Sequence, residues 1–98
     1  LIEKDTVVIA LATQPSVAQK TISNILETAA RGAKVILIAS QSQNTEGFEY
    51  VIRIPDVDPL LSCIPATVLL QELAYYVAKE KGCDVDKPRN LAKSVTVE

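Results

Sequence analysis

The sequence predicts an α/β protein built on a parallel sheet, and three observations indicate it. Residues 6–12 are a continuous apolar run, short and rich in β-branched residues, as in a strand covered on both faces, and residues 34–39 form a second strand. Between them, apolar residues recur at helical spacing. A strand, a helix and a strand in this order form a βαβ unit, whose crossover is right-handed by default.

The first helix is expected to follow Thr13, which can cap it, with Pro15 in the first turn, where a missing N–H does no harm. Gly32 is the expected stop, just after Arg31. The apolar positions of this helix are Val17, Ala18, Ile22, Ile25, Leu26, Ala29 and Ala30.

The second half of the chain predicts one more strand and one more helix. Residues 40–49 are polar and irregular, which indicates a loop, and residues 50–54 form a third short strand. Prolines at 55, 59 and 65 mark a turn and a stepped start to the last helix, which Gly82 ends. Its apolar face consists of Leu69, Leu70, Leu73, Ala74, Val77 and Ala78.

Together these elements amount to about half of a three-layer, flavodoxin-like sheet, with about three strands, two helices and an extended C-terminal tail. Three strands leave one face of the sheet poorly covered and an apolar strand at an edge, which favours association. The boundary is expected between residues 1–83, the sheet and its helices, and residues 84–98, the tail.

Composition excludes several classes of protein. A chain of 98 residues is one domain at most, and 48% hydrophobic residues are ample for its core. A net charge of −2 argues against a nucleic-acid or anionic-membrane surface. No apolar run approaches the roughly 20 residues of a membrane span. With no histidine and two cysteines, the usual zinc sites cannot be built, so no metal is expected.

The two cysteines, Cys63 and Cys83, lie in a sequence with no signal peptide and are expected to be reduced, structural residues of a cytoplasmic protein. The chain also begins at Leu1 without methionine and enters a strand within a few residues. This start is expected of a piece of a larger polypeptide.

The last fifteen residues, DVDKPRNLAKSVTVE, contain no further helix. Pro88 biases the residue before it away from helix, and residues 93–98 alternate polar and β-branched side chains, which suits an extended segment docked on a surface. This tail resembles, almost letter for letter, the end of the glucosamine-6-phosphate synthase family, the isomerising glutamine–fructose-6-phosphate amidotransferases. The rest of the chain is similar in pattern, including Gln71 with residues 73–75.

The resemblance implies that residues 1–83 are the C-terminal half of the second sugar isomerase (SIS) domain. It implies an enzyme that makes glucosamine 6-phosphate from fructose 6-phosphate and glutamine, by amino transfer and ketose–aldose isomerisation, the first step of amino-sugar synthesis. The partners implied are the N-terminal glutaminase and first SIS domains and a second subunit, paired through SIS domains. No cofactor is implied. The 98 residues alone are expected to be inactive.

Two alternatives remain open. One is a non-catalytic SIS-type module that binds phosphosugars and regulates a partner. The other is a simple βαβ interaction domain with an incidental tail. Neither gives a reason for the tail to carry Lys93.

The resemblance makes Lys93 the candidate catalytic residue. In the family, the lysine here takes part in opening the ring of fructose 6-phosphate, and a desolvated lysine can attack a carbonyl or shuttle protons. Ala92 matches a position whose backbone contacts the sugar. Asp86, Arg89 and Asn90 match a segment that helps form the ammonia route. They are also ordinary turn residues, with Asp86 able to accept bonds from backbone amides.

Other candidates have plainer explanations. The loop at 40–45, Ser-Gln-Ser-Gln-Asn-Thr, resembles an SIS phosphate loop, but it lacks the glycine and is followed by Glu46 and Glu49, which would repel phosphate. We therefore expect a surface loop. Glu72 and Glu80 are expected on the solvent-exposed face of the last helix. The family's catalytic base and histidine lie outside this sequence.

Overall fold

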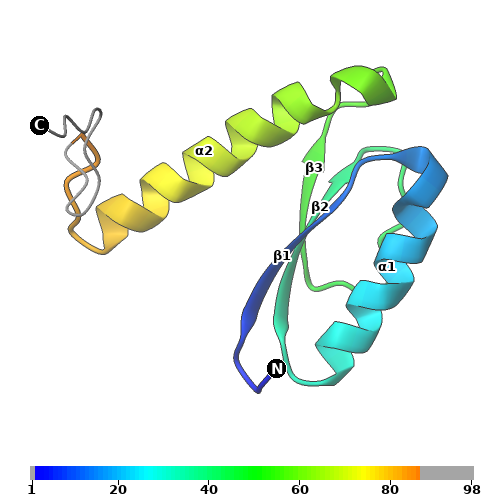
Figure 1. The fold of residues 1–98 in the computed structure, drawn as a ribbon, viewed down its shortest axis with the longest axis horizontal. Coiled ribbons are helices and arrows are strands. Elements are labelled where there is room, and N and C mark those ends of the chain that lie inside the picture. The colour runs from blue at the N-terminus through cyan, green and yellow to red at the C-terminus, as the bar shows by residue number, and fades with distance from the viewer. Residues whose placement is uncertain (1, 87–98) are drawn as a thin grey trace, which may run out of the picture. The chain divides into compact units, whose positions relative to one another are not determined.

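The computed structural model describes residues 2–86, and its contacts divide the chain into two compact units after Ala66. The elements, in chain order, are β1 (Val7–Ala12), α1 (Pro15–Ala30), β2 (Lys34–Ser40), β3 (Tyr50–Ile54), the short 3₁₀ turn η1 (Pro59–Leu61) and α2 (Cys63–Glu80) (Figure 1). The predicted three parallel strands and two helices are confirmed.

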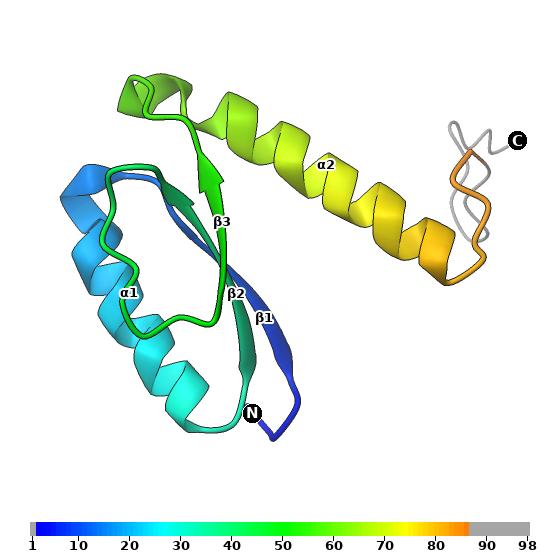
Figure 2. The same cartoon turned by 180° about the vertical axis from the view of Figure 1, so that it is seen from behind.

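The first unit contains a single sheet with the strand order β1-β2-β3, all parallel. β1 pairs with β2 from Val7↔Lys34 to Ala12↔Ala39, without interruption. β2 pairs with β3 as far as Ser40↔Ile54. Helix α1 lies along one face of this sheet, as the views from both sides show (Figures 1 and 2).

The main buried cluster of the unit lies between α1 and the sheet, and Ile38, Ile54 and Ala66 are buried outside it. Leu37, in the middle of the central strand, has no exposed surface. The buried residues of this cluster are Ala10, Ala12, Ala18, Val35, Leu37 and Ala39. Phe48 packs against them from the loop after β2, so this predicted surface loop also contributes to the core.

The faces of β1 differ, as the period-two geometry of a strand requires. Ala10 and Ala12 are buried towards α1, whereas Val7, Ile9 and Leu11 are exposed. Within the first unit, β1 is therefore covered on its α1 face alone, which differs from the expected strand covered on both faces.

Helix α1 starts one residue later than expected. Gln14, not Thr13, is the N-cap residue, with the extended backbone angles φ −101° and ψ 111°. Its carbonyl oxygen accepts hydrogen bonds from the N–H groups of Val17 and Ala18. The physical reason is Pro15, because a proline excludes the residue before it from the helical region.

Both predicted glycine stops are confirmed. Gly32 has φ +98° and Gly82 has φ +73°, in the left-handed region that glycine enters without strain. At the end of α2, the N–H of Cys83 donates to the Ala78 carbonyl and the N–H of Gly82 to the Lys79 carbonyl, at 2.9 and 3.0 Å. These two bonds form a Schellman motif.

One helical stretch, Pro59–Glu80, has a window of mean hydropathy 1.4 and is long and apolar enough to cross a membrane by length and composition. The expectation that no segment approaches this length is therefore wrong. The core helix of a soluble protein passes the same test, so the feature is weak evidence for a membrane span.

Candidate functional site

The loop after β2 is held at the carboxyl edge of the sheet by Arg53, which pairs with Ala39 in the β2–β3 ladder. The guanidinium Nη1 donates to the carbonyl oxygens of Ser40, at 2.9 Å, and of Gln41 and Gln43. Its Nη2 donates to Thr45 Oγ1 at 2.7 Å. One charged side chain thus hydrogen-bonds to the loop backbone at several positions, and its positive charge strengthens these bonds.

The same loop is fixed from the other side by Asp56. Its Oδ1 accepts from the backbone N–H and from the hydroxyl of Ser42, at 3.3 and 3.0 Å. Both Ser42 donors that a phosphate would need are therefore directed at a carboxylate, which repels an anion. The geometry favours a surface loop over a phosphate site.

A second polar cluster joins the end of β1 to the start of α2. The Gln14 side-chain nitrogen Nε2 donates to Ser62 Oγ at 2.7 Å and to the Pro59 carbonyl at 2.8 Å. The Ser62 hydroxyl also donates to the Pro59 carbonyl at 2.9 Å. Ser62 is 4% exposed, so these bonds satisfy a buried hydroxyl.

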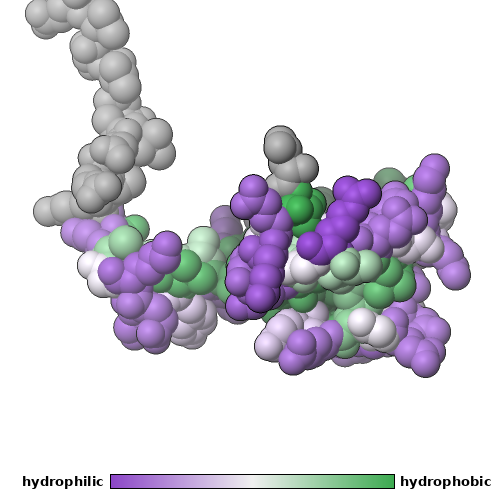
Figure 3. Space-filling model, turned by 90° about the horizontal axis from the view of Figure 1, so that it is seen from below, coloured by the Kyte–Doolittle hydropathy of each residue, from purple (hydrophilic) through white to green (hydrophobic). Residues whose placement is uncertain are grey.

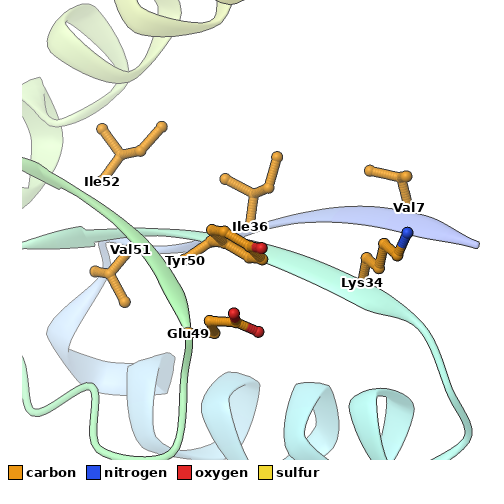
Figure 4. Close-up of a pocket in the computed structure, with 7 residues that line it drawn as sticks. All are labelled: Val7, Lys34, Ile36, Glu49, Tyr50, Val51 and Ile52. Atoms are coloured by element: carbon orange, nitrogen blue, oxygen red, sulfur yellow. The ribbon is translucent and has the colours of Figure 1, made fainter. Parts of the chain in front are cut away.

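The open face of the sheet carries a shallow, mostly apolar hollow of about 470 Å³. Val7, Ile36 and Ile52 point out of the sheet on the same side, whereas Val51 and Glu49 point the other way (Figure 4). Lys34 and Tyr50 complete the lining. Of its polar side chains, Glu49 points away from Val7, Ile36 and Ile52, and the Lys34 ammonium forms an ion pair with Asp5 at 3.4 Å.

Of the predicted site residues, only Asp86 lies among the described residues. Lys93, Ala92, Arg89 and Asn90 lie outside residues 2–86. The backbone N–H of Asp86 donates to Asp84 Oδ1 at 2.9 Å, which is an Asx turn. Asp84 therefore supplies the acceptor at this turn, a role that we expected of Asp86.

The remaining candidates have ordinary surroundings. Cys63 and Cys83 are free thiols, and both are exposed. Within residues 2–86 no three His, Cys, Asp or Glu side chains are grouped in a way that could hold a metal ion. Glu72 and Glu80 are exposed on α2, as expected.

Sequence reasoning missed the residues that organise this edge of the sheet: Arg53, Asp56 and Gln14. Arg53 had a signal, because it is a single charge inside the apolar strand YVIRI and such a charge needs a partner. Gln14 and Asp56 had no such sequence signal, since only the folded chain brings them to their hydrogen-bond partners.

No family model matches the chain. Its whole length is 54% identical to a glutamine–fructose-6-phosphate aminotransferase (isomerising) from Clostridium acetobutylicum and 56% identical to one from Clostridium tetani. A similar protein from Lactiplantibacillus plantarum is 52% identical. The chain spans 16% of the length of each of these relatives.

Among solved structures, the chain resembles the C-terminal domain of glucosamine-fructose-6-phosphate aminotransferase from Francisella tularensis. The TM-score is 0.76 at 30% identity, over 88% of this chain and 25% of that one. The resemblance predicted from the tail is therefore confirmed over the whole chain, and so is the fold of the C-terminal domain.

Proposed function

We propose that this chain is the C-terminal part of an isomerising glutamine–fructose-6-phosphate aminotransferase. The observation that carries the proposal is the 54–56% identity to two such proteins over all 98 residues. The agreement of the fold with the C-terminal domain of a third protein supports it. Both alignments cover all of this chain, including the tail, where the candidate site residues lie.

The reaction proposed for the whole protein moves an amino group from glutamine to fructose 6-phosphate and isomerises the product to glucosamine 6-phosphate. The isomerisation needs a proton transfer between neighbouring carbons, and hence a positioned acid or base and stabilisation of an enediol-like intermediate. Lys93 is proposed to take part in opening the sugar ring, and the backbone of Ala92 to contact the sugar. Asp86, Arg89 and Asn90 are proposed to shape the ammonia route.

The surroundings proposed for this chain are a glutaminase domain, a first SIS domain and a second subunit, in the cytoplasm. The sheet supports such a context, because the side chains of Val7, Ile9 and Leu11 in β1 are apolar and have no cover within the first unit. The 98 residues alone are proposed to be inactive, since they correspond to 16% of each relative.

A chimaera tests the proposal. This chain replaces the aligned segment of the Clostridium acetobutylicum relative, and glucosamine 6-phosphate formation and glutamine hydrolysis are measured separately. The parent chimaera is expected to perform both reactions. Lys93→Ala is expected to abolish sugar product while glutamine hydrolysis largely persists. Lys87→Ala, a lysine of the same tail, serves as the matched control and is expected to leave both rates near the parent values.

A chimaera that hydrolyses glutamine but forms no sugar product, with the parent Lys93 in place, contradicts the proposal. Tight binding of fructose 6-phosphate by the 98-residue chain itself would favour the regulatory module instead. Calorimetry with fructose 6-phosphate measures this directly, and we expect no binding, because the Ser42 donors face Asp56.

A further inference from the structure

The turn at the start of the loop after β2 contacts a cation on one side and an anion on the other. The N–H of Gln43 donates to the Ser40 carbonyl at 3.1 Å and closes the turn. The carbonyl groups of the turn are directed at the Arg53 guanidinium. The N–H and the hydroxyl of Ser42 instead donate to Asp56 Oδ1, at 3.3 and 3.0 Å. The turn is therefore polarised, with the Ser42 donors on its positive side.

The Ser42 side of the turn has the donors of a small oxyanion site. Backbone N–H groups of turns bind anions, and the oxygens of an ionised carboxylate, like those of a phosphate, only accept hydrogen bonds. Both donors of Ser42 converge on one carboxylate oxygen. Hydrogen bonds to a charged acceptor are stronger than those to a neutral one. Asp56 therefore occupies the place that an oxygen of a bound anion would take.

This contact lies at the carboxyl edge of the sheet. Ser40 is the last residue of β2 and pairs with Ile54, the last residue of β3. The N–H of Gln41 donates to the Ile54 carbonyl at 3.1 Å, so the turn and the segment that carries Asp56 start side by side. In open parallel sheets, ligands bind outside the carboxyl ends of the strands. A side chain of the same chain fills this position here.

Exposed polar side chains alone do not mark a binding site, and hydrophilic side chains are widespread on the face of the molecule in Figure 3. What distinguishes Ser42 is that its two donors meet one oxygen of a carboxylate 14 residues away. Both residues are exposed, so an anion in solution competes for the same donors. The carboxylate of Asp56 is tethered beside them, which gives it a high effective concentration. A free oxyanion therefore does not displace it.

We propose that Asp56 is a specificity-determining residue, which fills an oxyanion-binding turn with the chain's own carboxylate and so excludes phosphorylated ligands from it. Without this carboxylate, the N–H and the hydroxyl of Ser42 become available to inorganic phosphate. The alternative of a phosphosugar-binding module then has no phosphate site at this turn. The contacts all lie within the first unit, and the proposal does not depend on the proposed reaction.

Titration with inorganic phosphate, followed by the amide resonances of the 98-residue chain, tests the proposal. Sodium chloride keeps the ionic strength constant, because salt screens exposed charges. In the wild-type chain, the Ser42 amide is expected to show no saturable shift. In Asp56→Ala it is expected to shift saturably, with an affinity for phosphate at least about tenfold above that of the wild type, because the tethered competitor is gone.

Three further variants separate occupancy of the turn from net charge. Glu46→Gln is the matched control, since it removes a negative charge from the same loop but leaves the contact between Asp56 and Ser42, and no phosphate binding is expected. Asp56→Asn keeps a neutral acceptor at this place, so an affinity between wild type and Asp56→Ala is expected. Adding Ser42→Ala to Asp56→Ala removes the hydroxyl donor and is expected to weaken phosphate binding again.

A second measurement requires neither that the chain fold alone nor that the enzyme be active. In the chimaera described above, mass spectrometry follows hydrogen exchange in residues 40–49, and phosphate is expected to slow it in Asp56→Ala but not in the parent.

Three results would overturn the proposal. The first is an Asp56→Ala variant that responds to phosphate in neither measurement. The second is an equal gain of phosphate binding in Glu46→Gln, which would assign the exclusion to net charge. The third is unchanged binding when Ser42→Ala is added to Asp56→Ala, which would place the phosphate elsewhere.

Discussion

The side chain of Gln14 donates a 2.7 Å hydrogen bond to the hydroxyl of Ser62, a residue 48 positions further along the chain. The same nitrogen bonds the Pro59 carbonyl. Gln14 is also the N-cap of α1, so one residue begins the first helix and ties it to the start of the second. The cluster joins the carboxyl end of β1 to the segment that follows β3.

Replacing Gln14 with alanine is expected to lower the free energy of unfolding by about 1–2 kcal/mol, because two hydrogen bonds are lost, one of them to a buried hydroxyl. Urea unfolding followed by circular dichroism measures the change. Gln19→Ala is the matched control, since Gln19 is exposed on α1 and its side chain makes no hydrogen bond with the described residues. Equal losses in the two variants would show that the Gln14 bonds contribute nothing specific.

Arg53 is expected to control the order of the loop after β2. Arg53→Ala removes the donors to the carbonyls of Ser40, Gln41 and Gln43 and to the Thr45 hydroxyl. Hydrogen exchange in residues 40–49 should then accelerate by about tenfold, the equivalent of about 1.4 kcal/mol of local opening free energy. Exchange in α1 should not change.

Two variants sharpen this experiment. Arg53→Lys keeps the charge, but an ammonium group lacks the planar set of donors with which a guanidinium binds several carbonyls at once. Hydrogen exchange in residues 40–49 is therefore expected to be intermediate between the wild type and Arg53→Ala. Arg31→Ala is the control, because the Arg31 side chain has no hydrogen bond or ion pair within residues 2–86. Unchanged loop exchange in Arg53→Ala would mean that Asp56 alone holds the loop.

Gly32 is expected to be the less replaceable of the two helix-ending glycines. A Cβ at Gly32 would lie 3.2 Å from the Cα atom of Lys4, in addition to the strain of φ +98°. At Gly82, with φ +73°, no atom lies within 4 Å of the added carbon in the described part of the chain. The left-handed conformation costs an alanine about 1–2 kcal/mol, and the close backbone approach adds to this at Gly32 alone.

The measurement is the thermal midpoint of Gly32→Ala and of Gly82→Ala. We expect the larger decrease for Gly32→Ala, because Lys4 belongs to the turn that leads into β1 and must shift. A decrease as large for Gly82→Ala would indicate that backbone conformation alone sets the cost at both positions.

Much of the fold could be predicted from residues close together in the chain. The β-branched runs, the helical spacing from Val17 to Ala30 and the glycines after each helix are local signals, and each corresponds to an observed element. The expected cap at Thr13 failed for a local reason as well, since Pro15 moves the cap to Gln14. The candidate site residue Lys93 came from a resemblance in the tail, and it stays a prediction.

The sequence by itself determined the number, type and order of the elements and the family that the chain resembles. Only the tertiary structure decided which polar groups meet: Arg53 with the loop carbonyls, Asp56 with Ser42, and Gln14 with Ser62. It also decided that the exposed face of β1 is the one carrying Ile9. The physical reason is separation along the chain. Helix propensity and capping act between residues about one turn apart, whereas these contacts join residues 10 to 48 positions apart. The parallel crossover brings such residues together.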